Sequence, residues 1–554
     1  MAFVASTIWD VRTGGSDSNG GGFSPLITNM ATDLAATDAN TSAPVVTSAS
    51  YTFIARDVGH WLYVGAGTNW TPGWYEIASV AGGAATLSAA IGAGYLSTVD
   101  VPYAVTTAAG CATVASPTGG TWSVDYSQDT PISFTDLVID GTTNTDFTSA
   151  ANPMGVNFIG NVFNVTSGTG FTVQRVQVLS IPSAAVARAD KSMGTLSSTG
   201  GNATAGGPLV TPGQADALNV ASNTVFIGAA TYDMSNSASV AGGKVADATA
   251  GTAALPCRWI GWNTTRHILN SDSTRPLCRA NANSVTCWAI SGSNQITRNI
   301  DFGVNGSPSS VNGANLTGNF NRIENCTVTG AALSAGLSLG SATNSALNAK
   351  VFGSTISVTA GHIYGFIADD VVTLGGSGNC SAQYGVIYGG SGQLSFTGNG
   401  SNARNITVYG LSGTSGGVLL GSGIQNAVLA NILSYGNGTS GAGCNYTDAG
   451  ATNVTGSKLI NCAGGGGFAA DDISPLIKEN FITLTEDPFT DAAGGNFTLN
   501  DAAGGGALLK AAGFPTEYPG LTGIANSVDV GAYQTASEGG GAALLVSGMT
   551  GGLV

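Results

Sequence analysis

Charged side chains are scarce in this sequence. Asp, Glu, Lys and Arg make up 9% of the 554 residues, whereas ordinary soluble domains carry about 25%. Basic residues are the scarcer sign, because Lys and Arg total 17 and the formal net charge is −15. A nucleic-acid-binding face needs clustered Lys and Arg to neutralise phosphates. The composition therefore excludes a general nucleic-acid binder.

Long apolar runs and export signals are also missing. No stretch approaches the roughly 20 apolar residues that a membrane-spanning helix needs, so no membrane insertion is expected. The first ten residues have neither the basic segment nor the apolar core of a secretory signal. Sequons at Asn325 and Asn405 fall in apparent strands, where an attached glycan would disrupt packing. These features together predict synthesis in a bacterial cytoplasm.

The eight cysteines form no recognisable framework. They are scattered along the chain, without a Cys-x-x-Cys pair, at positions Cys111, Cys257, Cys278, Cys287, Cys326, Cys380, Cys444 and Cys462. The three histidines, His60, His267 and His362, are equally far apart. Such spacing predicts no metal site and no cofactor. We expect reduced and mostly buried thiols that behave as small apolar side chains.

Small and turn-forming residues fill the space that charges leave. Glycine alone supplies 83 residues, and 43% of the chain is hydrophobic, which argues against intrinsic disorder. The sequence is poor in the Glu, Lys, Arg and Leu that surface helices use. It is therefore predicted to be almost entirely β and to turn often.

A loose repeat runs through the middle of the chain. Short β-branched runs end in Gly or Asn and then return, as at 322–330, 404–410 and 428–436. Ile406 returns as Ile432 after 26 positions, and Ile432 as Ile460 after 28. A period of this size indicates a solenoid whose coils stack on one another. Alternate Val, Ile and Leu would point inward, with Gly and Asn at corners that need positive φ. An Asn recurring at one corner could form a ladder of side chains.

Three segments carry a family resemblance. Residues 158–165 and 170–173 look like coils of pectin-lyase-like β-helices, and 9–23 is similar to the entry of phage-encoded ones. The order of 487–499, 511–515 and 528–534 resembles the closing segment of many β-helix repeat proteins. The resemblance implies an all-β, right-handed parallel β-helix of the phage type. It further implies a homotrimer, since such proteins commonly associate side by side.

The sequence divides into five segments by composition. These are an entry or attachment segment at 1–43, a small antiparallel β module at 44–105, a parallel β-helix at 106–486, a closing segment at 487–535, and a Gly-rich apolar tail at 536–554. The β module and the closing segment are expected to cap the open ends of the solenoid. The tail could be a docking peptide for another subunit or a frayed end.

Catalytic residues are not evident. The local acidic pairs are Asp369-Asp370, Asp471-Asp472 and Glu486-Asp487. Adjacent strand residues point to opposite faces, so none of these forms the paired carboxylates of a glycosidase by itself. Asp487 and Asp529 belong to the closing motif and are expected to form turns or caps.

One stretch combines aromatic and basic residues. Trp259, Trp262 and Arg266 are candidate glycan contacts, and the alternative is a wide coil with packed tryptophans.

The preferred function is a non-enzymatic structural or attachment component of a phage-like virion. It would be a tail spike, a fibre or a capsid decoration, giving rigid reach or contact with host surface glycans. Other virion proteins would bind through the termini. The alternatives are a phage depolymerase that cleaves host surface polysaccharide and a bacterial surface adhesin. Enzymatic activity stays open, with the balance against it.

Overall fold

The computed structural model describes most of the chain in short stretches. The described residues are 7–23, 31–36, 43–70, 73–88, 95–98, 101–107, 116–125, 130–139, 142–234, 244–262, 274–281, 283, 286–305, 311–330, 333–376, 380–389, 392–410, 417–437, 445–448, 455–465, 477–510, 512–513 and 530–532. The chain divides into two compact units, one of residues 1–232 with 254–276 and one of residues 233–253 with 277–554. Strands dominate both units, as the composition predicts.

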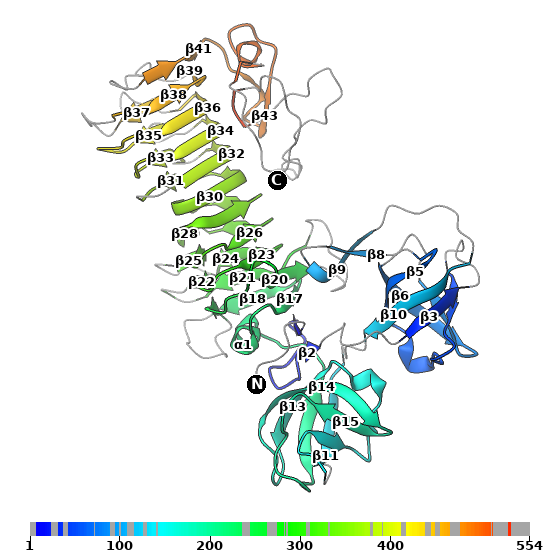
Figure 1. The fold of residues 1–554 in the computed structure, drawn as a ribbon. Helices are drawn as coiled ribbons and strands as arrows, with labels where there is room; N and C mark the ends of the chain where they lie inside the picture. Colours follow the sequence, from blue (N-terminus) through cyan, green and yellow to red (C-terminus); the bar gives the residue numbers. More distant parts are fainter. Residues whose placement is uncertain are drawn as a thin grey trace. The chain divides into compact units, whose positions relative to one another are not determined.

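The first unit contains an antiparallel barrel near its N-terminus (Figure 1, blue). Its strands are β3 (Ala31–Ala36), β4 (Val45–Thr47), β5 (Trp61–Thr68), β6 (Gly73–Ala81), β7 (Ala84–Leu87) and β10 (Thr118–Asp125), with the hairpin β8 (Tyr95–Thr98) and β9 (Val101–Thr107) added to β6. The order β5-β10-β3-β4-β7-β6 returns to β5, which closes the ring. The expected antiparallel module is thus present with wider limits than 44–105.

A second, closed barrel follows in the same unit (Figure 1, cyan). It consists of β11 (Ile132–Ile139), β12 (Asp146–Thr148), β13 (Val162–Ser167), β14 (Gln174–Ser183), β15 (Val186–Ala189) and β16 (Gly201–Ala205). Phenylalanines from four positions pack in its core with ring centroids 5.1–5.8 Å apart: Phe134, Phe147, Phe158 and Phe163.

The two barrels are copies of one module. Their strands follow the same ring order, and both enter the third strand through a 3₁₀ turn, at Ala55–Asp57 and at Val156–Phe158. Gly59 donates its backbone N–H to Ile77 and Gly160 to Val178, each at 2.8 Å. These pairs of positions all differ by 101 residues, so the chain contains an internal duplication.

An aromatic ring covers a strand glycine in each copy. A Cβ added to Gly120 would lie 2.7 Å from the Trp70 ring, and one added to Gly201 would lie 2.5 Å from the Phe171 ring. Trp70 and Phe171 are again 101 positions apart. The close contact explains why each copy keeps glycine at this point of its last strand.

The second barrel stands where a β-helix was expected. Residues 158–165 and 170–173 resemble coils, but β13 pairs with β14 in the antiparallel sense, with Val162 opposite Gln177. The solenoid therefore does not begin near residue 106. Short alternating strands with glycine turns suit a hairpin and a coil equally, because the side-chain period is two in both.

The N-terminal strand is separated in sequence from its partner by both barrels. β1 (Ile8–Val11) pairs with β2 (Gly22–Phe23) and, in parallel, with β17 (Thr224–Gly228). β17 then pairs in parallel with β20 (Cys257–Trp262). The one α-helix among the described residues, α1 (Pro212–Leu218), precedes β17 and is capped by Thr211, whose hydroxyl accepts from the N–H of Gln214.

Corresponding faces of the two barrels pack near this strand. Trp61, Tyr63 and Trp74 of the first barrel join an apolar cluster with Ile8 and Trp262. The equivalent positions of the second barrel are Val162, Asn164 and Arg175.

Arg175 holds the N-terminal loop to the second barrel. Its guanidinium donates to the carbonyl oxygens of Asp17, Asn19 and Gly20 at 2.5–3.2 Å. The same face of the module therefore makes contacts in both barrels. The contacts are made by aromatic rings in the first barrel and by the guanidinium of Arg175 in the second.

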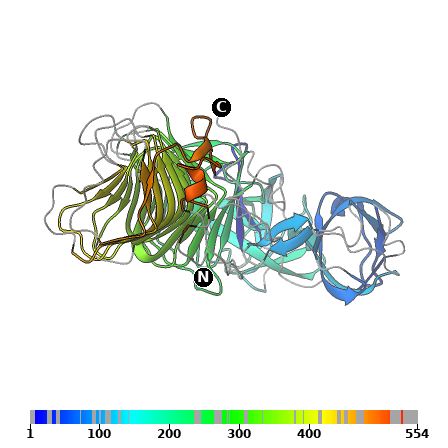
Figure 2. The same ribbon diagram turned by 90° about the horizontal axis from the view of Figure 1, so that it is seen from above.

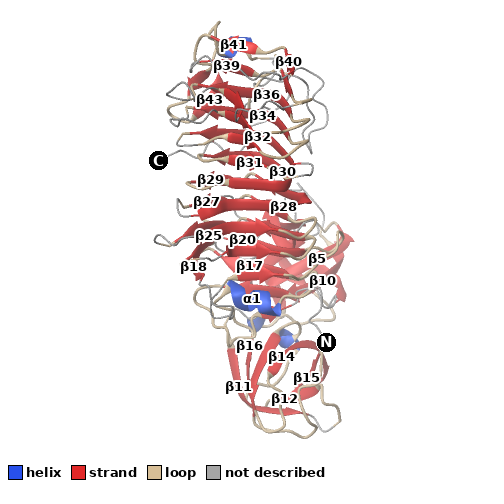
Figure 3. Cartoon of the chain, turned by 90° about the vertical axis from the view of Figure 1, so that its left-hand side faces the viewer, coloured by secondary structure: helices blue, strands red, loops and turns tan. Residues whose placement is uncertain are grey.

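The second unit is a parallel β-helix of three sheets, whose coils lie one above another (Figures 2 and 3). Sheet I contains β19 (Val245–Asp247), β22 (Thr286–Ile290), β25 (Val311–Leu316), β31 (Val372–Leu374), β33 (Leu394–Phe396), β35 (Val418–Leu420) and β37 (Tyr446–Asp448). Sheet II contains β23 (Gln295–Arg298), β26 (Arg322–Glu324), β38 (Lys458–Ile460) and β40 (Ile477–Glu479). Sheet III contains β21 (Leu277–Ala280), β24 (Asp301–Val304), β27 (Thr327–Thr329), β29 (Lys350–Phe352), β39 (Ala463–Gly465) and β41 (Ile482–Leu484).

Longer strands bend from one sheet into the next. They are β28 (Leu333–Leu347), β30 (Ile356–Ala368), β32 (Cys380–Tyr388), β34 (Asn402–Tyr409) and β36 (Val428–Tyr435). β18 (Thr231–Met234) lies at the sequence boundary of the two units. The second unit therefore has the parallel β-helix fold that the sequence predicts.

The register tests the predicted returns. Ile406 pairs with Ile432 as expected. The predicted return from Ile432 to Ile460 is wrong by two positions, because Ile460 pairs with Ala430 and not with Ile432.

Asparagines line the corner between sheets II and III. Positive φ angles of 47–57° occur at Asn299, Asn325, Asn348, Asn405, Asn431, Asn461 and Asn480. The amide of Asn431 donates to the Oδ1 of Asn405 at 2.8 Å, and that of Asn348 to Asn325 at 3.1 Å. The expected ladder is confirmed at these steps.

The closing segment lies against the outer side of sheet III (Figure 1, orange). Its hairpin of β42 (Phe489–Asp491) and β43 (Asn496–Leu499) precedes a 3₁₀ turn at Gly506–Leu508. Phe489 and Phe497 pack with Tyr409, and the N–H of Gly531 donates to the carbonyl of Asn431. The segment was expected to cap the end of the solenoid. Its described part instead covers the side of the coils.

Six cysteines fall in the described part, and all are buried free thiols: Cys257, Cys278, Cys287, Cys326, Cys380 and Cys462. Cys111 and Cys444 lie outside the described residues. The expectation of buried thiols is confirmed for the six. Burial raises the pKa of Cys287 and of Cys462 to about 12, which keeps these thiols protonated and unreactive.

Candidate functional site

Sheet II presents a polar outer surface. Its inward residues, such as Ile323, Ile363 and Leu459, have no exposed surface. The alternating outward residues form the polar face, defined as Arg298, Arg322, Glu324, Ser345, His362, Tyr364, Ser381, Gln383, Asn402, Arg404 and Lys458. In a chain with so few charges, this sheet gathers an unusual number of them. It is the candidate site.

One end of the polar face is an ion-pair network. Glu324 accepts from the Nε of Arg298 at 2.6 Å and is also paired with Arg322. All three side chains are at most 35% exposed. The two guanidinium groups engage the carboxylate, so Glu324 serves to fix both arginines in place.

The centre of the face is a grid of six residues on three successive coils. His362, Ser381 and Asn402 stand in register on β30, β32 and β34. Two positions further along the same strands stand Tyr364, Gln383 and Arg404. Neighbouring coils lie about 4.8 Å apart, so the grid offers hydrogen-bonding groups at a regular, closely spaced interval. The coils that flank the second column carry Leu347 and Ala430.

His362 is the titratable group of this grid. Its Nδ1 lies 2.8 Å from the Oγ of Ser381, and its ring centroid lies 6.2 Å from that of Tyr364. Burial lowers the pKa of His362 against a smaller opposing effect of a backbone hydrogen bond at Ala342. The imidazole is therefore neutral at pH 7, and it can both donate and accept a hydrogen bond.

A second cluster lies where the closing segment meets sheet III. Tyr388, Tyr409 and Tyr435 are in register, and the rings of Tyr409 and Tyr435 stack at 6.4 Å. Burial, and then the charge of Asp487, raise the pKa of Tyr409 and of Tyr435. Both phenols consequently stay protonated and can donate hydrogen bonds.

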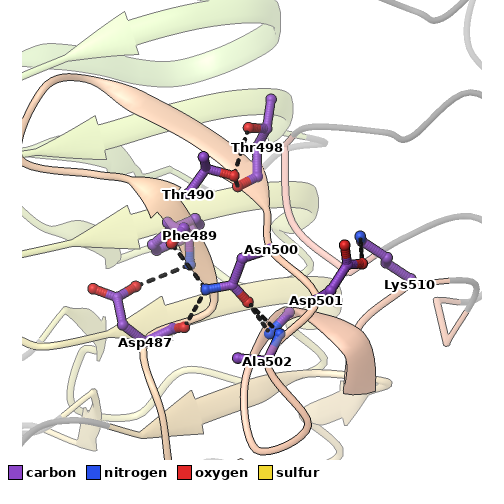
Figure 4. A network of polar contacts seen from close by, with 9 residues as sticks. Asp487, Phe489, Thr490, Thr498, Asn500, Asp501, Ala502 and Lys510 are labelled. Carbon is purple, nitrogen blue, oxygen red and sulfur yellow. Dashed lines mark hydrogen bonds and ion pairs between the residues drawn. The ribbon is translucent and has the colours of Figure 1, made fainter.

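The hairpin of the closing segment is held together by one asparagine (Figure 4). The amide of Asn500 donates to the carbonyls of Asp487 and Phe489 at 2.7 and 2.9 Å. Its Oδ1 accepts from the N–H groups of Ala502 and Gly506. All four hydrogen-bonding positions of this side chain are thus filled.

Two of the three residues that the sequence suggested as glycan contacts are buried. Trp259 has no exposed surface and Trp262 is 7% exposed. Arg12 lies over the Trp262 ring at 5.1 Å. Arg266 lies outside the described residues, so the three-residue contact remains a prediction. In this conformation neither indole offers an open face for a sugar.

The acidic pairs act mainly in turns. Asp369 accepts from the N–H of Gly353 at 2.6 Å and Asp370 from that of Val371 at 2.7 Å. Asp487 accepts from the N–H of Phe489 at 2.9 Å, as a turn-forming residue should. Asp471, Asp472 and Asp529 lie outside the described residues.

The described part of the chain contains neither a metal-binding cluster nor a membrane-spanning helix. Within it, no group of three or more His, Cys, Asp and Glu side chains is placed to hold a metal ion. No helix there is long and apolar enough to span a membrane.

Sequence reasoning missed the polar face, although a local signal exists. Two outward polar residues flank an inward apolar one immediately before the corner residue. This pattern appears in Arg322-Ile323-Glu324-Asn325, His362-Ile363-Tyr364-Gly365 and Asn402-Ala403-Arg404-Asn405. The corner Asn or Gly could therefore have been used to align the coils.

Comparisons with known proteins give similarities of fold. No family model and no curated protein matches the sequence. Among solved structures, a pectate lyase is 12% identical, with 60% of this chain and 92% of that chain covered and a TM-score of 0.37. A capsular polysaccharide depolymerase, the tailspike protein of Acinetobacter baumannii bacteriophage Fri1, is 7% identical, with coverage of 47% and 50% and a TM-score of 0.28.

A polysaccharide lyase of the PL6 family from Pseudopedobacter saltans is 8% identical. The alignment covers 51% of this chain and 93% of that chain, with a TM-score of 0.28. At such low values none of these similarities carries an argument about activity. The proposed function is therefore based on the side chains of the polar face.

Proposed function

We propose that this protein is a non-catalytic glycan-binding component of a phage-like particle, and that the polar face is its glycan contact. The observation that carries the proposal is the grid, in which five partly exposed residues lie on successive coils: His362, Tyr364, Gln383, Asn402 and Arg404. The sixth residue, Ser381, is buried and contacts His362. Hydroxyl, amide, imidazole and guanidinium groups in one plane match the hydroxyl-rich surface of a sugar polymer. Because they repeat from coil to coil, weak contacts can add along one chain of sugars.

The placement of carboxylates argues against glycoside hydrolysis on this face. Glycoside hydrolysis needs two carboxyl groups about 5–10 Å apart. The described carboxylates of sheet II are Glu324 and Glu479, at the two ends of one column of stacked residues. Seven coil steps separate them, which corresponds to about 34 Å. Glu324 is in addition held by two arginines.

Binding to host polysaccharide tests the glycan contact. Purified protein should bind immobilised capsular polysaccharide or lipopolysaccharide from the host. The variants Arg404→Gln and Tyr364→Ala should each weaken binding by about tenfold, the usual size of a central contact. Ser357→Ala, on the outer side of sheet I, is the matched control and should bind as the wild type does. Equal binding by all four proteins would contradict the assignment of the polar face.

The enzymatic alternative rests on a different cluster. Burial raises the pKa of Tyr409, and the charges of Asp487 and then Asp491 raise it further, since both carboxylates lie near this phenol. Both also form turns, since Asp491 accepts from the N–H of Gly494 at 3.0 Å. Release of oligosaccharides that is abolished by Asp487→Asn or Asp491→Asn would make the protein a depolymerase. We expect no sustained release.

Association with a particle is the second part of the proposal. A stack of parallel coils provides a stiff support, and the entry segment 9–23 resembles that of phage-encoded β-helix proteins. Purified particles from the phage-producing host should therefore contain the chain, as detected by mass spectrometry. Its presence only in the bacterial envelope would favour the adhesin instead.

A further inference from the structure

An exposed phenylalanine occupies an unfavourable backbone position at the edge of the polar face. Phe320 has φ of +56° and its side chain is 61% exposed. A bulky side chain is rare in the left-handed region because its Cβ approaches the backbone too closely. Exposure also denies the ring the burial that normally compensates a strained conformation. Neither packing nor backbone preference accounts for phenylalanine here.

The same corner of other coils contains residues suited to positive φ. Asn294 precedes Phe320 by one coil, with φ of +55°. Gly400, Asn426 and Gly456 occupy the corner in later coils, with φ of +58° to +74°. Thr343 and Ala360 stand at this position in the two coils that follow Phe320, and neither has positive φ. Among the described residues of the column, every position with positive φ except Phe320 is therefore Asn or Gly.

Hydrogen bonds on both sides fix this backbone. The N–H of Phe320 donates to the Oγ1 of Thr343 at 2.8 Å. The next residue, Asn321, is buried, and its N–H donates to the Oδ1 of Asn344 at 3.0 Å. The next coil thus holds the backbone of Phe320 and Asn321 in place.

Polar groups surround the base of the ring. Ser341 donates to the Oδ1 of Asn319 at 2.6 Å and lies 3.2 Å from the hydroxyl of Thr343. Two residues after Phe320 comes Arg322 of the polar face. An aromatic ring next to hydroxyl and amide groups suits the C–H face and the hydroxyls of a pyranose ring.

We infer that Phe320 is a stacking platform for a pyranose unit at one end of the glycan held by the polar face. This inference rests on the proposed function. The backbone strain is retained because it turns the ring out of the coil surface, beside the hydroxyls of Ser341 and Thr343. A sugar chain bound to the grid would end its contact on this ring.

Two substitutions separate binding from folding. Phe320→Asn introduces the residue found at this corner in two other coils, so it should leave the melting temperature unchanged or higher. It should weaken polysaccharide binding by about tenfold. Phe320→Trp keeps an aromatic face and should retain binding, and its fluorescence should shift to shorter wavelength on addition of polysaccharide. The probes are neutral and acidic capsular polysaccharides and lipopolysaccharide.

Three outcomes distinguish failure of the stacking platform from failure of the proposed function. If Arg404→Gln loses binding while Phe320→Asn does not, the polar face binds glycan and the stacking platform is wrong. If Phe320→Asn changes the oligomeric state in light scattering and not the affinity, the ring is a subunit contact and the inference is overturned. If the wild-type protein binds none of the probes, the proposed function fails and the inference fails with it.

Discussion

At the residue scale, the corner between sheets II and III depends on side chains that accept positive φ. Asparagine does so because its short amide forms hydrogen bonds along the stack. Tyr384 interrupts the column with φ of +56°, and it is 3% exposed. Gly365 stands one coil before it, also with positive φ.

Substitutions at Asn431 should separate the amide ladder from the backbone. Asn431→Gly keeps positive φ accessible but removes the hydrogen bond to Asn405. Asn431→Ala removes the bond and also places a methyl group in left-handed backbone, which should cost about 1–2 kcal/mol more. Chemical denaturation followed by far-ultraviolet circular dichroism measures both. Equal stability of the two variants would show that the corner imposes no conformational cost.

Gly385 lies under an aromatic ring. A Cβ at this position would be 2.1 Å from the nearest ring carbons of Phe366. Gly385→Ala should therefore destabilise the solenoid by about 1–3 kcal/mol, as overpacked cores do. Gly303→Ala, also in sheet III, is the control, because its Cβ would meet its nearest atoms at an ordinary 3.4 Å. A stable Gly385→Ala variant would mean that Phe366 can move aside.

At the element scale, each barrel copy has an aspartate in its first strand. Its carboxylate accepts hydrogen bonds from the turn that follows the second strand. Asp33 accepts from the hydroxyl of Ser48 at 2.8 Å and the N–H of Ser50 at 2.7 Å. Asp136 accepts from the hydroxyl of Ser149 at 2.6 Å and the N–H of Ala151 at 2.8 Å. Ser48 and Ser149 are again 101 positions apart. The duplication thus extends to the hydrogen bonds.

These aspartates should make the barrels sensitive to acid. Burial opposes the shift at Asp33, but hydrogen bonds from Ser48, Ser50 and Trp122 together hold its pKa well below the ordinary value. Hydrogen bonds from Ser149 and then Ala151 lower the pKa of Asp136. A lowered pKa in the folded state gives stability that is complete above the unfolded value of about 3.9 and is lost as the pH falls toward the folded value.

Thermal unfolding of the full chain between pH 2 and 7 measures this effect. The barrel transition should be constant above about pH 5 and fall below about pH 4. Asp33→Asn should melt earlier than the wild type at pH 7, and the difference should shrink in acid. A difference that is the same at pH 3 and pH 7 would contradict the role of the carboxylate.

Asn500 should determine whether the closing segment stays on the coils. Asn500→Leu removes two donors and an acceptor with two partners. Unpaired carbonyl and N–H groups would remain, which should cost about 2–4 kcal/mol locally. Limited proteolysis should then cut the variant near β42 and β43 well before the wild type. Thr490→Val, which removes an exposed hydroxyl of the same hairpin, should change little.

At the scale of the whole molecule, we expect a homotrimer, on the basis of the resemblance to phage β-helix proteins. Light scattering of the purified full chain at micromolar concentration should give about three times the mass of 54.8 kDa. Dilution should not dissociate it, because such long side-by-side interfaces are normally extensive. A monomer would contradict the trimer and leave the fold unaffected.

The solenoid was predictable because its signals are local. Apolar alternation and corner asparagines occur within single coils, and the 26-residue return of Ile406 to Ile432 matches the register. The second barrel was not, since hairpin strands and coil strands share a period of two. The polar face requires each coil to be aligned with the next, and the shift of two at Ile460 shows how unequal loops defeat this. Phe320 gives no signal until its φ angle is known.

The placement of β1 fixes the order in which the molecule can be assembled. Ile8 pairs with Thr224, so the ribosome must produce both barrels before the partner strand exists. At about 5–20 residues per second, the nascent chain waits roughly 10–40 s. During this time the guanidinium of Arg175 can already hold the loop behind β1 against the second barrel. The second barrel would then keep the first strand in place until β17 is synthesised and pairs with it.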